Sequence, residues 1–68
     1  MFPEGQQVEF TEGPFMNSTG PVISCEEVVH RGGIGLVDAA QADTVFVVLT
    51  FWGRDVIVPA TPNQIRAI

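Results

Sequence analysis

Residues 45–59 constrain the fold more than any other part of the chain. Residues 45–52 are almost entirely apolar and rich in Val and Phe, a composition that favours a β-strand. Gly53 interrupts this run and residues 54–58 form a second, shorter strand, so the stretch predicts two strands joined by a sharp corner. Both faces of the first strand are mainly apolar. We therefore expect its second face to be covered by an insertion, a terminus or a partner.

Three further segments predict the rest of a β-rich fold. Residues 6–10 alternate polar and apolar side chains, which is typical of a half-buried strand, and residues 21–29 predict a second strand. Residues 65–68 form a short closing strand. A helical turn precedes it, with Thr61 as the cap and Pro62 in the first position, because the fixed φ of proline suits the start of a helix.

The connection between strands two and three is the least regular part of the chain. Residues 30–43 predict an extended loop, far longer than the roughly two to five residues of a usual hairpin connection. It starts with a glycine-rich spacer at 31–35. Residues 38–42 predict either one turn of helix capped by Asp38 or a mobile hairpin tip. At the other end of the chain, residues 1–5 are expected to be a loose N-terminus.

Length and composition indicate one small folded domain covering residues 1–68. A domain of this size buries only about 60% of the surface that its unfolded chain exposes. The chain is 46% hydrophobic and contains five Phe and one Trp, which argues for a packed core and against disorder. Short strands separated by Gly and Pro, with almost no helix, predict an all-β fold: a small barrel of four to five antiparallel strands.

The charge balance favours a protein partner over a nucleic acid. Eight Asp and Glu oppose three Lys and Arg, for a net charge of −5. Such a surface repels phosphates, and cations that neutralise phosphates provide most of the affinity for nucleic acids. The N-terminus lacks a basic region followed by an apolar one, and no apolar run approaches the ~20 residues of a membrane span. We expect a cytoplasmic protein, with which the lone Cys25 is compatible.

No residues suggest catalysis. The chain has one His and one Cys, so neither a multi-Cys zinc site nor an internal disulfide is expected. No set of acid, base and nucleophile is apparent. We expect a non-enzymatic protein without a metal or cofactor, in which Cys25 is a small buried or half-buried hydrophobe.

Several short motifs occur in a specific order along nearly the whole chain. They are Gly13-Pro14-Phe15, then Gly20, then Phe51-Trp52-Gly53-Arg54, and finally Gln64-Ile65. With strands expected between them, this ordered set resembles the C-terminal KOW domain of the NusG family of bacterial transcription elongation and antitermination factors. The resemblance covers residues 5–68. It implies an SH3-like barrel whose turns are shaped by Gly13, Pro14, Gly20 and Gly53; Gly13 and Gly20 are expected in backbone conformations that other residues avoid.

The resemblance also implies a function and a surface. KOW domains of this family recruit the ribosomal protein NusE, and hence the ribosome, or the termination factor Rho. The matching partner-binding residues here are Phe15, Met16, Phe51, Trp52 and Arg54. The chain departs from the family at Ser18, where a second aromatic residue is common, and at residues 56–59. The connection between strands two and three is also longer, and residues 1–68 contain no counterpart of the family's N-terminal polymerase-binding domain.

Each of these side chains also has an ordinary structural interpretation. Trp52 could fill the barrel, Phe15 could plug its end, and Phe51 could belong to the core. Arg54 could pair with Asp55 or Glu12.

Two other functions remain open. A monomer is favoured, but a self-associating structural module could pair two copies through the second apolar face or an open barrel edge. A ribosome- or RNA-binding KOW protein would instead form a salt-dependent complex with RNA.

Overall fold

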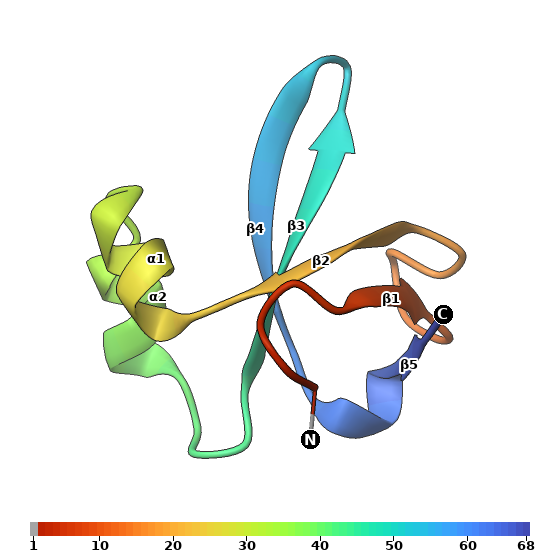
Figure 1. The fold of residues 1–68 in the computed structure, drawn as a ribbon, viewed down its shortest axis with the longest axis horizontal. Helices are drawn as coiled ribbons and strands as arrows, with labels where there is room; N and C mark the ends of the chain where they lie inside the picture. Colours follow the sequence, from red (N-terminus) through yellow and green to blue (C-terminus); the bar gives the residue numbers. More distant parts are fainter. Residues whose placement is uncertain (1) are drawn as a thin grey trace.

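A five-stranded antiparallel sheet organises the chain (Figure 1). The computed structural model describes residues 2–68. The strands are β1 (Gln7–Phe10), β2 (Thr19–Ile23), β3 (Val45–Phe51), β4 (Arg54–Ala60) and β5 (Ile65–Ala67), in the spatial order β4-β3-β2-β1-β5. This arrangement confirms the predicted small all-β fold. It is consistent with an SH3-like barrel, although the sheet is not closed.

Strand β2 joins two halves of the sheet. It pairs with β1 on one side, where Val8 lies opposite Gly20, and with β3 on the other, where Val22 lies opposite Val47. In Figure 1, β1 and β2 run across the β3–β4 hairpin, so the two halves face each other across a core. The core consists of alternate side chains from all five strands: Val8, Phe10, Val22, Val45, Val47, Leu49, Val58, Ala60 and Ile65.

Gly20 lies where β2 crosses β3. The prediction that Gly20 shapes a turn, in a backbone conformation that other residues avoid, is wrong. Gly20 lies within β2, and only Gly5, Gly13, Gly32 and Gly53 among the described glycines have positive φ. A Cβ atom at position 20 would instead overlap the backbone carbonyl of Val48. Glycine is therefore required for the close approach of two strands, and the prediction for Gly13, with φ of 83°, is confirmed.

The predicted second strand is too long. It ends at Ile23, and residues that were expected to continue it form helix α1 (Cys25–His30). Ser24 starts the helix, since its Oγ accepts a hydrogen bond of 3.0 Å from the backbone N–H of Glu27. Ser24 followed three residues later by Glu27 is a recognised helix-start pattern, and it outweighs the β-propensity of the two valines that follow.

The rest of the connection also differs from the expected extended loop. Helix α2 (Ile34–Ala39) follows α1 after a turn at Gly32, and Gly33 precedes its first residue. Asp38 lies inside α2 and does not cap it, and the segment is not a hairpin tip. Cys25, expected to be buried or half-buried, is exposed at the start of α1. Strands β2 and β3 are thus linked by a helical insertion covering residues 24–44.

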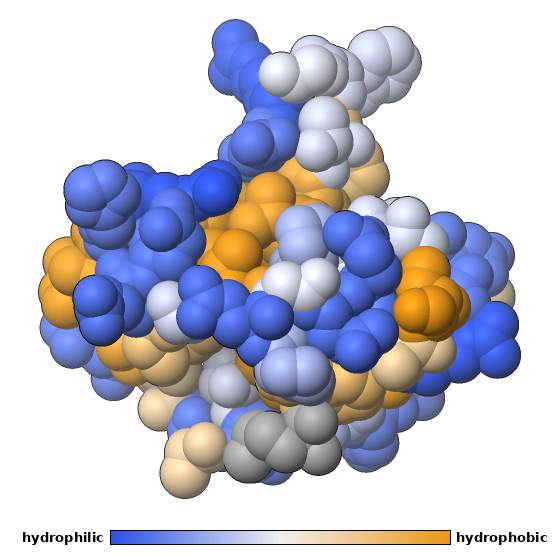
Figure 2. Space-filling view, in the orientation of Figure 1, coloured by the Kyte–Doolittle hydropathy of each residue, from blue (hydrophilic) through white to orange (hydrophobic). Residues whose placement is uncertain are grey.

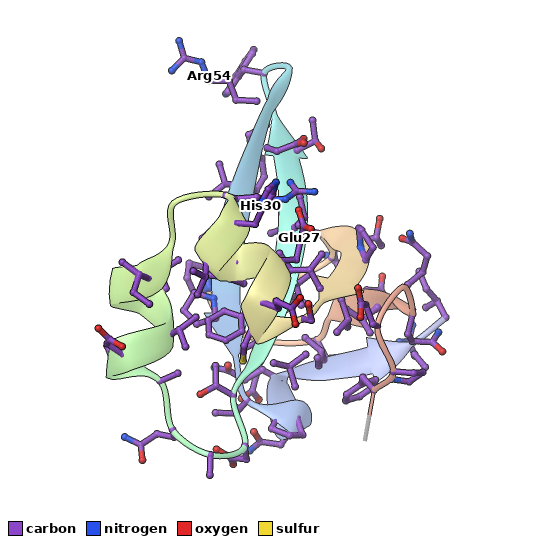
Figure 3. All side chains as sticks on the ribbon, turned by 60° about the vertical axis from the view of Figure 1, so that its left-hand side comes forward. Glu27, His30 and Arg54 are labelled. Carbon is purple, nitrogen blue, oxygen red and sulfur yellow. The ribbon has the colours of Figure 1, made fainter. Side chains whose placement is uncertain are left out.

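This insertion covers the outer face of β3, one of the three possibilities left open by the sequence. Phe46 and Val48 point away from the barrel core yet are 2% and 7% exposed, and Val28 of α1 is fully buried. Arg31, at the end of α1, approaches Asp55 on the same face of β4. Figures 1 and 3 both place α1 and α2 beside the hairpin, below its free end.

The C-terminal segment forms as expected. Thr61 precedes a 3-10 turn, η1 (Pro62–Gln64), and its backbone N–H donates a 3.0 Å hydrogen bond to Oε1 of Gln64. Ile65 then begins the closing strand and is buried. Within residues 2–68, none of the helices has the length and apolar character needed to cross a bilayer.

The cap at Ser24 leads to a stability prediction. We expect Ser24→Ala to lower the free energy of unfolding by about 1 kcal/mol, because the N–H of Glu27 loses its acceptor. Urea denaturation measures the change. Ser18→Ala is the control, since this half-buried Ser lies in a loop; it should change stability by less than about 0.5 kcal/mol. Equal effects of the two substitutions would contradict the capping role.

Candidate protein-binding site

The hairpin tip, defined as Trp52, Gly53 and Arg54, projects from the body of the molecule (Figures 1 and 3). Phe51 pairs with Arg54, so only Trp52 and Gly53 form the loop. Both have positive φ, 54° and 76°. A two-residue loop with two positive φ values is a type I′ turn, whose handedness matches the twist of the strands and which usually contains Asn-Gly or Gly-Gly.

Trp52 is an unusual residue for the first loop position. A bulky side chain with positive φ is rare, because its Cβ crowds the backbone. Its side chain is 101% exposed, so it does not fill the barrel. Backbone strain that packing does not explain often occurs at functional positions. Trp52 is therefore the first residue to consider for an external contact.

Arg54 differs from the other two arginines. Arg31 pairs with Glu27 at 2.7 Å, and Arg66 pairs with Glu9 at 2.6 Å. Arg54 is exposed and forms no ion pair with any residue in the described part of the chain. Neither of its two expected intramolecular partners, Asp55 and Glu12, pairs with it. A net-negative chain thus places an uncompensated cation next to a fully exposed indole.

Two of the predicted site residues, Phe15 and Phe51, belong to an aromatic cluster directly beside the hairpin tip. The rings of Phe15 and Phe51 stack with centroids 6.0 Å apart, and Phe10 lies 5.9 Å from Phe15. Phe15 and Phe51 are half-buried and pack against the core. They thus fit their structural interpretations, and they connect the β1–β2 loop to the hairpin.

Met16 follows Phe15 in the β1–β2 loop and is 56% exposed. Asn17 next to it has a φ of 74°, a conformation that the sequence did not indicate, and its N–H donates a hydrogen bond to the carbonyl of Phe10. A shallow hollow of about 210 Å³ lies beside the loop and is lined in part by Glu12, Pro14 and Phe15. Of the five predicted residues, the structure leaves Met16, Trp52 and Arg54 exposed.

A second hollow, which sequence analysis did not indicate, lies at α1. Its volume is about 620 Å³, and it is lined by Glu4, Ser24, Glu26, Glu27, Val29 and His30. Val29 is 42% exposed there. The hollow could have been predicted from the helix-start pattern of Ser24 and Glu27. This pattern places Glu26 and Glu27 in the first turn of a helix.

The Glu27–Arg31 pair predicts a small pH effect. The hydrogen bond from Arg31 lowers the pKa of Glu27 below its ordinary value of 4.5. Because the pKa is lower in the folded state, the ionised Glu27 carboxylate stabilises the fold at pH values above its ordinary pKa. This stabilisation is lost as the pH falls through the folded-state pKa. NMR titration should show the depressed pKa, and Arg31→Gln should return it toward 4.5. An unchanged pKa in this variant would contradict the assignment.

Comparison with known proteins adds no assignment: no family model matches the chain, and no curated protein is significantly similar to it. The described residues contain no group of three or more metal-ligating side chains.

Proposed function

We propose that the chain is a non-enzymatic KOW-type module that recruits a protein partner through the hairpin tip. The observation that carries the proposal is Trp52, which is fully exposed on a turn whose conformation disfavours it. Trp and Arg are the residues most enriched among those that dominate binding energy at interfaces, and here they are two positions apart. Met16 provides a further exposed and adaptable apolar contact.

The class of partner follows from the charges. Arg31 and Arg66 form ion pairs with carboxylates of the same chain. The described surface therefore has no cluster of free cations that could bind a phosphate backbone. This favours a protein over RNA. Strand order and the ordered Gly13-Pro14-Phe15 and Phe51–Arg54 motifs support a transcription elongation or antitermination role in the bacterial cytoplasm. By that resemblance the partner is ribosomal protein NusE, and through it the ribosome, or Rho.

The proposal is tested by measuring binding of the chain to NusE, to Rho and to single-stranded RNA at two salt concentrations. We expect saturable binding to one of the two proteins and none to RNA. Binding to RNA that weakens steeply with salt would instead favour the ribosome- or RNA-binding alternative. The absence of binding to both proteins would contradict the proposed partners.

A further inference from the structure

We propose that two copies of this chain associate reciprocally, with the hairpin tip of each seated on the helical insertion of the other. This contact goes beyond the proposed function, since it involves no other protein.

The insertion has an apolar surface that nothing within the described chain covers. Three of its large side chains are exposed: Val29 by 42%, Ile34 by 54% and Leu36 by 37%. Helix α2 has no buried residue and no side-chain cap. Figure 2 shows apolar side chains among hydrophilic ones over the part of the molecule where α1 and α2 lie. These exposed apolar side chains give the insertion a surface that a partner can cover.

The charges beside Val29 define the kind of group that fits there. The hollow that Val29 lines also contains Glu4, Glu26 and Glu27. Glu27 is paired with Arg31, whereas Glu4 and Glu26 are exposed and have no ion pair within residues 2–68. The surface therefore suits a ligand that presents an apolar group together with a cation.

The hairpin tip of this same chain presents that combination. Trp52 supplies a fully exposed apolar ring, and Arg54 supplies a cation without an intramolecular partner. The complementarity of charge and polarity between two surfaces of one molecule favours a second copy as the occupant. The hollow of about 620 Å³ at α1 is open to solvent, so the indole of a second copy can enter it.

Within one molecule Arg54 forms no ion pair with Glu4 or Glu26. Figure 3 shows Arg54 at the free end of the hairpin, pointing away from Glu27 and His30 on α1, and Figure 1 shows the same separation of the free end from the helices. Two antiparallel hairpins can each reach the partner's insertion, which gives a closed, two-fold symmetric dimer. In this dimer the tip is covered, so self-association and recruitment of another protein would compete.

The test is sedimentation equilibrium of the purified chain alone at rising concentration and low salt. The mean mass of the wild type should rise toward that of a dimer. Arg54→Glu and Glu26→Arg should each remain monomeric, because each places like charges opposite one another in both copies of the contact. An equimolar mixture of the two variants should dimerise again, since the exchanged charges are then complementary.

Two further variants keep the test decisive. Glu4→Arg makes the same charge reversal at a residue outside α1 and should likewise remain monomeric. Loss of dimerisation in Glu26→Arg then cannot be attributed to a less stable helix. Glu12→Arg makes the same charge change in the β1–β2 loop and should dimerise like the wild type. A wild type that stays monomeric, or a mixture that stays monomeric, would overturn the proposal. Neither of these results would contradict the proposed binding of NusE or Rho, because the samples contain only this chain.

Discussion

Trp52→Asn is expected to stabilise the fold and to weaken partner binding. Unfolding free energy should rise by about 1 kcal/mol, because Asn tolerates positive φ far better than Trp and Asn-Gly is the favoured type I′ pair. No packing is lost, since the Trp52 side chain is fully exposed. Removal of a dominant aromatic contact should lower affinity by roughly 30-fold, which corresponds to about 2 kcal/mol.

Denaturation and binding titrations on the same preparations measure both quantities. Ile68→Asn is the matched control, because Ile68 is also a large apolar side chain and is 62% exposed. It follows β5, the edge strand on the opposite side of the sheet from β4. This substitution should leave affinity unchanged. A less stable Trp52→Asn variant would show that Trp52 supports the fold, and an unchanged affinity would remove it from the binding surface.

Gly20→Ala should be the most destabilising small substitution in the chain. The added methyl group would overlap the carbonyl oxygen of Val48 and crowd the side chain of Leu49, so β2 and β3 must separate where they cross. Overpacking at such a site costs about 3 kcal/mol, a large share of the stability of a small domain. Thermal or urea denaturation should show this loss, and a change below about 1 kcal/mol would contradict the close approach of the strands.

Gly35→Ala provides the matched control for this substitution. Gly35 lies within α2, and an added Cβ meets no atom within 4 Å. The same change from Gly to Ala should therefore stabilise the fold by up to about 1 kcal/mol, the helix-propensity difference between the two residues. Effects of opposite sign at positions 20 and 35 would separate steric overlap from backbone flexibility.

The strands with strong local patterns could be predicted from the sequence. Three of these patterns depend on neighbouring residues alone. They are the long apolar run that starts at Val45, the turn at Gly53 that ends it, and the start of the last helical turn at Thr61 and Pro62. Residues 25–30 could not be assigned by β-propensity, because the Ser24 cap decides their conformation. The role of Gly20 depends on Val48, far away in the chain, and no local pattern contains that information.

The candidate site was predictable only in part. Trp52 and Arg54 stand out because they flank a glycine between two strands, and the structure leaves both exposed. Phe15 and Phe51 could not be distinguished from core residues by sequence, since their stacking joins segments that are distant in the chain. The hollow at α1 was missed together with the helix that forms it.

The most direct test of the hairpin tip as the partner-binding site is an amide-shift titration of the labelled chain with NusE, repeated with Rho. The proposal predicts that one of these proteins causes its largest shifts at Trp52, Gly53 and Arg54, with smaller shifts at Met16. Shifts concentrated on α1 and α2 or on β5, with the hairpin tip unaffected, would contradict it. The absence of shifts with both proteins at saturating concentration would contradict it as well.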